Sequence, residues 1–187
     1  LDLDGTLLTS EKTISPANYA ALSRCAERGI HIVPSTGRFY SGMPQVVRGL
    51  PFIRYVVAVN GAHVCDVIAG QVLRREEISL DTAFEVFEVL DRLPVIYDCF
   101  LDDWGYMGED MYQQIDWFIA DPRVNRMVKE LRRPVPDLRA YLAEQGQPLQ
   151  KIQMFFRDME ARSTALERLP GRFPNLTVTS SIANNIE

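Results

Sequence analysis

The chain has 187 residues, of which 47% are hydrophobic and 24% are charged. This balance is typical of a globular protein with one large or two small domains. The formal net charge of -5 argues against non-specific nucleic-acid binding, which depends on a basic surface. The printed residues contain neither a run long enough to span a bilayer nor a signal peptide. We expect a cytoplasmic protein, monomeric or homodimeric, without a nucleic-acid or membrane partner.

The cysteines and histidines are scattered along the sequence. Cys25, Cys65 and Cys99 form no Cys-x-x-Cys pair of the kind that binds metal or cycles between redox states. An odd number of isolated cysteines suits a reducing compartment and buried, inert thiols. His31 and His63 are equally isolated, and we expect both to be structural.

The first sixty residues predict the order strand, helix, strand, helix, strand. Ser15 is a suitable N-cap and Pro16 a suitable first residue for a helix that stops at Gly29. Tyr19, Leu22 and Ala26 are expected to form its apolar face. Short apolar strands that alternate with helices imply a parallel sheet with right-handed crossovers. The strands are expected to end near Asp4 and to span 30–33 and 55–59, with the second helix over 43–50.

The pattern changes after Ala62, and the regular alternation is lost. Strands over 63–68 and 71–75 flank Ala69-Gly70 as a hairpin. We expect a separate α+β domain from about Ser79, so that the chain divides into 1–78 and 79–187. Helices are predicted over 81–92, 109–119, 137–144 and 158–169 (stopped by Pro170-Gly171), strands over 95–101, 151–156 and 176–179, a loop over 102–105 and a stiff surface connection over 132–136.

The most informative motif is Asp2-Leu3-Asp4-Gly5-Thr6 at the start of the chain. Residues two apart on an extended strand point to the same side, so the two carboxylates would lie side by side at a strand tip. Adjacent carboxylates repel each other unless a cation or a shared proton intervenes. The pair therefore suits a divalent-cation site, although an isolated Asp-x-Asp-Gly also suits a solvated turn.

Polar residues follow the next two predicted strands as well, with Thr36 and Arg38 after the second and Asn60 after the third. Ligands of parallel sheets bind beyond the carboxyl ends of the strands. The three polar clusters are thus predicted to meet in one crevice. Two alternatives stay open: Arg38 could form an ion pair within its loop, and Asn60 could cap its strand end.

These motifs resemble those of the haloacid dehalogenase (HAD) superfamily of phosphohydrolases. Residues 2–8 look like motif I, Thr36-Gly37-Arg38 looks like motif II of the Cof-type branch, subclass IIB, and Asn60-Gly61-Ala62 matches the Asn-Gly-Ala of that branch. The resemblance implies an α/β fold, with a Rossmann-like parallel-sheet core and an inserted α+β cap domain that selects the substrate.

The resemblance also assigns roles to the residues of motif I. Asp2 would attack phosphorus to form an aspartyl-phosphate, and Asp4 would be the general acid/base. Mg²⁺, which prefers oxygen ligands, would be held by the Asp2 carboxylate and the Asp4 backbone carbonyl. Gly5 permits the turn, and Thr6 would hold the loop in place.

The resemblance assigns phosphate binding to the other two motifs. The Thr36 hydroxyl, the Gly37 amide near a helix N-terminus and the Arg38 guanidinium would bind the phosphoryl group, and Asn60 would touch the phosphate or orient Asp4. Candidate substrate contacts in the cap are Asp103 and Trp104, together with their neighbours Asp102 and Tyr106 in a polar, aromatic loop.

The sequence departs from the family pattern in two motifs. A motif III lysine and a motif IV acidic cluster are absent, and neither Lys129 nor Lys151 stands in a motif III context. We therefore expect the printed chain to be truncated at both ends, with the C-terminal core segment missing and with little activity of its own.

The predicted function is that of a Mg²⁺-dependent phosphatase that hydrolyses small phosphorylated metabolites, either sugar phosphates or nucleotide-like cofactors, through an aspartyl-phosphate. Two alternatives stay open. One is a non-catalytic phosphate-binding module, and the other is a phosphomutase that uses the same phospho-aspartate.

Overall fold

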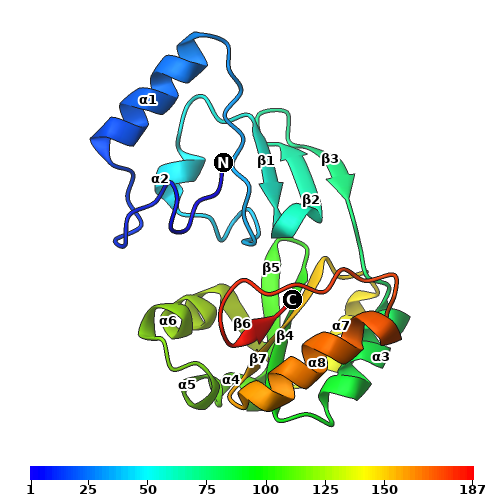
Figure 1. Cartoon of the computed structure of the whole chain (residues 1–187). Coiled ribbons are helices and arrows are strands. Elements are labelled where there is room, and N and C mark those ends of the chain that lie inside the picture. The colour runs from blue at the N-terminus through cyan, green and yellow to red at the C-terminus, as the bar shows by residue number, and fades with distance from the viewer. The chain divides into compact units, whose positions relative to one another are not determined.

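The computed structural model describes all 187 residues, which divide into two compact units, Leu1–Glu76 and Glu77–Glu187. We call them the N-terminal unit and the C-terminal unit and describe each by itself (Figure 1). Every helix is too short or too polar to serve as a membrane-spanning segment.

The N-terminal unit contains a three-stranded antiparallel sheet in the order β1-β2-β3. The predicted hairpin is confirmed by the pairing of β2 with β3. The predicted strand over 55–59 ends one residue early, because Val59 and Asn60 have φ values of 51° and 55° and leave the extended conformation. The strands are β1 Tyr55–Ala58, β2 His63–Asp66 and β3 Gln71–Arg75.

Two further segments run alongside β1 in parallel. The Leu1 amino group donates to the Val33 carbonyl at 2.7 Å, and the Ser35 amide donates to the Leu1 carbonyl at 2.8 Å. Ser35 in turn forms a parallel bridge with Val57 of β1. The parallel arrangement is therefore present as isolated bridges. The predicted strand over 30–33 is wrong, because the pairing begins only at Val33 and Ile30 is 54% exposed.

Both helices expected in the N-terminal unit form. Helix α1, Pro16–Glu27, begins at the N-cap Ser15, whose Oγ accepts the Asn18 amide at 3.1 Å. None of its residues is buried and Tyr19 is 45% exposed, so the expected apolar face is only partly covered. Helix α2 is shorter than predicted, at Gln45–Arg48, because Pro44 precedes it and Gly49 ends it.

The C-terminal unit is built on a five-stranded sheet in the order β6-β5-β4-β7-β8 (Figure 1). The β5–β6 pair is parallel and the other three pairs are antiparallel. The sequence predicts both ends of β4 and β7 correctly. The strands are β4 Val95–Leu101, β5 Trp104–Gly108, β6 Arg132–Val135, β7 Lys151–Phe156 and β8 Asn185–Ile186.

Helices pack on both faces of this sheet. Phe87 of α3, Leu142 of α7 and Leu169 of α8 belong to the core on one face. Ile115 of α5 and Val128 of α6 pack with strand residues of the other face. The helices are α3 Leu80–Leu90, α4 Glu109–Tyr112, α5 Ile115–Phe118, α6 Pro122–Leu131, α7 Leu138–Gln145 and α8 Met159–Arg172.

Several sequence predictions for this unit are wrong in detail. Residues 132–135 form strand β6 and not a surface connection. The strand is at the sheet edge, where Pro134 is tolerated. Trp104 opens β5 and does not lie in a loop, because Asp102 and Asp103 both have positive φ and close a two-residue hairpin turn.

Three more elements differ from the predictions. The predicted helix over 109–119 divides into α4 and α5, and helix α6 was not predicted. Helix α8 continues through Pro170, which lies in its last turn, and the Phe173 amide still donates to the Leu169 carbonyl at 2.9 Å. The predicted strand over 176–179 makes only a reciprocal hydrogen-bonded pair between Thr179 and Glu187, and β8 is the edge strand instead.

Candidate active site

A tight turn in the N-terminal unit presents the two carboxylates of motif I. The Leu3 carbonyl accepts the amides of Thr6, Leu7 and Leu8 at 3.3, 3.1 and 2.9 Å. The turn depends on Gly5, whose φ of +80° is costly for other residues. Leu3 is fully buried, whereas Asp2 and Asp4 on either side of it are exposed. The predicted strand ending near Asp4 is wrong, because Leu3 already lies in this turn and residues 1–4 form no strand.

Asp2 and Asp4 have different surroundings. An Asp2 carboxylate oxygen accepts a hydrogen bond from the Thr6 hydroxyl at 2.9 Å, so Thr6 holds the turn against Asp2. No lysine or arginine pairs with Asp2. By contrast, Asp4 forms ion pairs with two cations, Arg38 and Lys12.

Arg38 grips Asp4 with two nitrogens. Its Nε donates to Oδ2 at 2.7 Å and its Nη2 donates to Oδ1 at 3.1 Å, which is the two-pronged geometry that suits a carboxylate. Nη1 of Arg38 donates to the Gly42 carbonyl at 3.2 Å and fixes the guanidinium from behind. Partial burial by itself would raise the pKa of Asp4, but hydrogen bonds from Arg38 and Lys12 outweigh this effect and hold the pKa below its usual value.

Lys12 is a site residue that the sequence analysis did not identify. Its Nζ donates to Oδ1 of Asp4 at 2.6 Å. Lys12 lies in a tight turn with φ of 59°, and an antiparallel bridge between Leu8 and Ile14 closes this small loop. Hydrogen bonds between Thr9 and Thr13, one of them between their hydroxyls at 2.8 Å, stiffen the loop. No motif signals this contact, because it depends on the shape of the turn.

The Thr36-Gly37-Arg38 loop is anchored to the end of β1. Thr36 is buried, its amide donates to Val57 at 2.9 Å and its hydroxyl oxygen accepts the Arg38 amide at 3.2 Å. That contact leaves the Thr36 hydroxyl proton available as a donor. The expected helix N-terminus near Gly37 is wrong, because α2 begins only at Gln45.

The turn after β1 holds this loop through its backbone. The Val59 amide donates to the Arg38 carbonyl at 3.0 Å, and the Asn60 amide donates to the Thr36 carbonyl at 3.1 Å. Both donors have positive φ, which is unusual for a β-branched residue such as Val59. The Asn60 side chain lies against Gly37, where an added Cβ would be 2.6 Å from its Oδ1. A strained backbone turn at Val59 and Asn60 therefore joins the Asn60-Gly61-Ala62 motif to Thr36-Gly37-Arg38.

Contacts link the three motifs of the N-terminal unit through Asp4, Arg38 and Asn60, whereas the side chain of Asp2 contacts only Thr6 of its own motif. Asp2 contacts Thr6, Asp4 contacts Arg38, and Asn60 packs against Gly37. The linked residues are Asp4, Thr36, Gly37, Arg38 and Asn60, with Lys12 added by the structure.

The candidate cap contacts lie in the C-terminal unit. Asp103 closes the β4–β5 turn, and Trp104 packs beneath the Arg133 guanidinium, whose Cζ is 3.7 Å from the ring centroid. Tyr106 is buried, with its ring centroid 4.8 Å from that of Tyr141. Tyr106 therefore belongs to the core of this unit.

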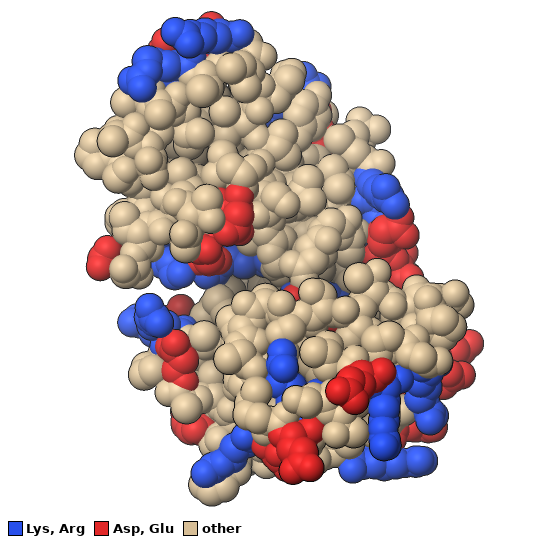
Figure 2. All heavy atoms as spheres, viewed as in Figure 1, with Lys and Arg blue, Asp and Glu red and all other residues tan.

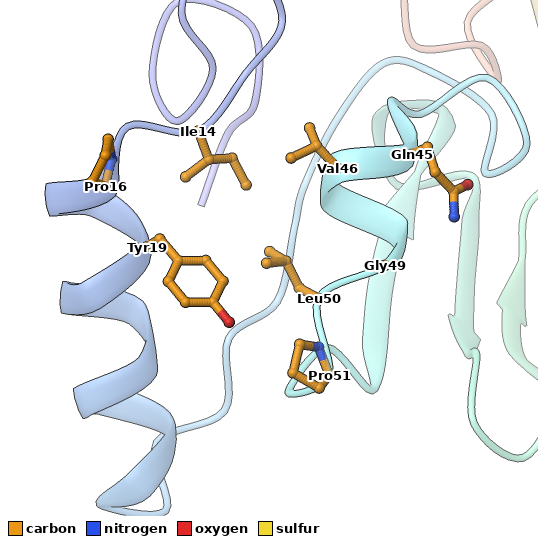
Figure 3. Close-up of a pocket in the computed structure, with 8 residues that line it drawn as sticks. All are labelled: Ile14, Pro16, Tyr19, Gln45, Val46, Gly49, Leu50 and Pro51. Atoms are coloured by element: carbon orange, nitrogen blue, oxygen red, sulfur yellow. The ribbon is translucent and has the colours of Figure 1, made fainter.

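The pocket of the N-terminal unit is separate from the candidate residues. A pocket of about 560 Å³ lies between α1 and α2, but apolar residues such as Tyr19, Val46 and Leu50 line most of it (Figure 3). None of the candidate residues contributes to this pocket. No group of three or more His, Cys, Asp or Glu side chains is arranged to hold a metal ion.

A second ionic cluster is buried within the C-terminal unit. Asp98 Oδ2 lies 2.9 Å from Arg132 Nε, in a contact with ion-pair distance but without good hydrogen-bond alignment. Lys151 Nζ lies 2.8 Å from a Glu187 carboxylate oxygen, and both of these side chains are also buried. Burial raises the pKa of Asp98 despite Arg132, and burial lowers the pKa of Lys151 despite Glu187. On the face in Figure 2, the other charges of this unit are interspersed in sign.

A sequence model of the haloacid dehalogenase-like hydrolase family matches residues 1–187. The chain belongs to this family, which confirms the prediction from motif I.

Curated relatives in this family are phosphatases. The pyridoxal phosphate phosphatase YbhA of Escherichia coli is 31% identical over 103 residues, which are 55% of this chain and 38% of the relative. The HMP-PP phosphatase of Serratia proteamaculans is 32% identical over 108 residues, which are 58% of this chain and 39% of the relative. The chain matches about two fifths of the length of these relatives.

Solved structures share the fold. A haloacid dehalogenase-like hydrolase from Bacillus subtilis superposes with a TM-score of 0.77 at 23% identity, over 100% of this chain and 70% of that one. The HAD subclass IIB sugar phosphatase BT4131 superposes with a TM-score of 0.75 at 14% identity, over 99% of this chain and 66% of that one. At these identities the match establishes the fold, and it confirms the predicted α/β class.

Proposed function

We propose that this chain belongs to a cytoplasmic, Mg²⁺-dependent phosphatase that hydrolyses small phosphorylated metabolites through an aspartyl-phosphate. One observation supports the proposal above the others. Of the two motif I carboxylates, Asp4 is paired with two cations and Asp2 with none. This difference leaves the Asp2 carboxylate free to attack phosphorus. The two cations hold the pKa of Asp4 below its usual value, which keeps Asp4 ionised as the base for the second displacement.

The reaction needs two displacements at phosphorus. An Asp2 carboxylate oxygen attacks phosphorus while the ester P–O bond breaks, and Asp4 donates a proton to the departing oxygen. Asp4 then takes a proton from a water molecule as that water attacks the phosphorus of the aspartyl-phosphate. The bond between phosphorus and Asp2 breaks, which releases phosphate and restores both carboxyl groups.

The phosphoryl group would be held by the loop that follows the second strand end. The Thr36 hydroxyl, the Gly37 amide and the Arg38 guanidinium are its proposed donors, with Asn60 beside Gly37. Arg38 contacts Asp4 and is only 13% exposed in its side chain. One guanidinium can therefore touch both the acid/base group and an anion bound next to it.

Of the two motif I carboxylates, only that of Asp2 is free to bind a magnesium ion. Mg²⁺ binds through one or two carboxylates and keeps several of its waters. The exposed Asp2 carboxylate is suited to this role, whereas the Asp4 carboxylate is already neutralised by two cations. We assign the Asp2 carboxylate and the Asp4 backbone carbonyl as ligands. A bound ion would offset the repulsion between the Asp2 anion and the phosphate ester.

The substrate class is drawn from the relatives, which include a pyridoxal phosphate phosphatase and an HMP-PP phosphatase. Both names describe small phosphorylated metabolites. The C-terminal unit would act as the substrate-selecting cap, and Asp103 and Trp104 are its candidate contact residues. A phosphomutase that uses the same aspartyl-phosphate is the second candidate.

The test is phosphate release by the protein expressed from its complete gene, with a panel of small phosphate monoesters, with and without Mg²⁺. We expect metal-dependent release that Asp2→Asn abolishes, whereas Glu11→Gln, an exposed change in the neighbouring loop, retains it. Hydrolysis in ¹⁸O-labelled water should place the label in the released phosphate. Phosphate transfer to a sugar hydroxyl would indicate the mutase, and phosphate binding without release or transfer would indicate a binding module.

A further inference from the structure

We infer that Lys12 is a positioning residue for Asp4, an assignment that rests on the proposed function. Nothing in motifs I or II calls for a lysine at this place. The structure nevertheless joins Lys12 Nζ to Oδ1 of Asp4 at 2.6 Å, the oxygen that also accepts Nη2 of Arg38 at 3.1 Å.

The two cations hold Asp4 from different elements of the N-terminal unit. Arg38 reaches Asp4 from the loop after Pro34, and Lys12 reaches it from the loop closed by the Leu8–Ile14 bridge. Without Lys12, the Arg38 guanidinium alone would hold the Asp4 side chain, which is 37% exposed. Lys12 adds a second charge-assisted hydrogen bond to Oδ1, from a different element than Arg38.

The loop that carries Lys12 is built for this contact. Lys12 has a positive φ, and its amide donates to the Thr9 carbonyl at 3.0 Å. The Thr9 amide donates to the Thr13 carbonyl at 2.9 Å, so the turn is closed on both sides of Lys12. A lysine on a mobile loop would lose side-chain entropy on pairing, and this rigid turn reduces that cost.

Positioning has a kinetic signature that differs from substrate binding. If Lys12 only orients Asp4, its loss slows proton transfer and leaves ground-state binding unchanged. Small displacements of a reacting group cost up to about 100-fold in rate. We therefore expect Lys12→Met to lower kcat by about 10- to 100-fold with KM changed by less than about twofold. Lys12→Arg, which keeps the cation, should recover part of the lost kcat.

The matched control is Lys129→Met. Lys129 pairs with Asp116 in the C-terminal unit at the same distance of 2.6 Å, and both lysines are substantially exposed. Lys129→Met removes a similar ion pair from outside the site and should leave kcat unchanged. Loss of kcat in this control equal to the loss in Lys12→Met would overturn the assignment.

A double-mutant cycle separates positioning of Asp4 from a general effect on the fold. In an Asp4→Asn background, Lys12→Met should have no further effect on the residual rate, because the carboxylate that it orients is gone. Independent, additive losses would overturn the inference, and so would a rise in KM without a fall in kcat.

A readout that needs no turnover keeps the inference separate from the proposed function. In a crystal structure of Lys12→Met, we expect the Asp4 carboxylate to leave the two-pronged contact with Arg38 or to occupy more than one rotamer. An Asp4 side chain that stays in place would overturn the role of Lys12. Absence of phosphate release by the wild-type protein would refute the proposed phosphatase instead.

Discussion

Arg38 binds Asp4 through two parallel hydrogen bonds of 2.7 and 3.1 Å, although 34 positions separate the two residues in the chain. This contact links the residues assigned to motif I and motif II. In the resting protein Arg38 pairs with Asp4 of motif I, whereas the alternative that the sequence left open was an ion pair within the Arg38 loop. Phosphate binding by the same guanidinium stays a prediction.

The contact predicts that lysine cannot replace Arg38. Lysine keeps the charge but has a single ammonium group. That group cannot bind both carboxylate oxygens of Asp4 and also donate to the Gly42 carbonyl. We expect Arg38→Lys to reduce kcat/KM by about 10- to 100-fold, in the range found when an oriented group is lost. Steady-state kinetics test this, with Arg54→Lys as the control, because Arg54 pairs with Asp66 outside the candidate site. Equal kcat/KM in Arg38→Lys and the wild-type protein would contradict the proposed geometry.

The close contact of Gly37 with Asn60 leads to a second prediction. A Cβ at position 37 would lie 2.6 Å from Oδ1 of Asn60, so Gly37→Ala must displace that side chain. The displaced atom is at the end of a flexible side chain, so we expect a loss of stability below about 1 kcal/mol together with a clear loss of turnover. Thermal unfolding and phosphate release measured on the same samples test this.

Asn60→Ala supplies the control for that experiment. It removes the atom that Gly37→Ala would strike, so the double variant should be no worse than Asn60→Ala alone. If Gly37→Ala lowers turnover by the same factor in both backgrounds, the contact with Asn60 is not the cause.

The sequence predicted best those elements whose local pattern agrees with their environment. β4 and β7 are continuous apolar runs buried along their whole length, and their ends agree with the structure. Helix α1 carries its own start signal in Ser15 and Pro16. Motif I was visible because Gly5 and the two aspartates are adjacent in sequence.

Other features depend on contacts that no local pattern contains. β6 reads as Arg132-Arg133-Pro134, with no alternation of apolar and polar residues, and Arg132 is buried because Asp98 pairs with it from another strand. Lys12 joins the site only because a turn with positive φ aims it at Asp4. Such pairings between distant positions need the folded structure to be seen.

The Asp98–Arg132 pair leads to a stability prediction. Removing one partner of a buried pair leaves the other as an uncompensated charge, at a cost of about 3–5 kcal/mol. We expect Arg132→Met or Asp98→Leu alone to destabilise the protein by about this amount, whereas the double variant should lose much less, since apolar replacements of both partners are often neutral. Urea-induced unfolding measures all three variants. Additive losses in the double variant would contradict the pairing.

Asp66 leads to a prediction about pH. This buried carboxylate accepts the Ala69 amide at 2.9 Å, the Arg54 Nε at 2.7 Å and the Ile68 amide at 3.0 Å. The hydrogen bond from Ala69 is the main cause of a pKa held below the usual aspartate value, although burial opposes it. Because the folded-state pKa is the lower one, Asp66 contributes stability that is fully present above about pH 4 and is lost as the pH falls through its folded-state pKa.

We therefore expect Asp66→Asn to destabilise the hairpin of β2 and β3 at pH 7 and to reduce the further loss of stability on acidification. Urea midpoints at a series of pH values from about 6 to 2 compare this variant with the wild-type protein. Asp121→Asn is the control, because Asp121 also has a lowered pKa but is solvent-exposed and paired with Arg123 in the other unit. Parallel pH profiles of the wild-type and Asp66→Asn proteins would show that Asp66 makes no contribution to acid stability.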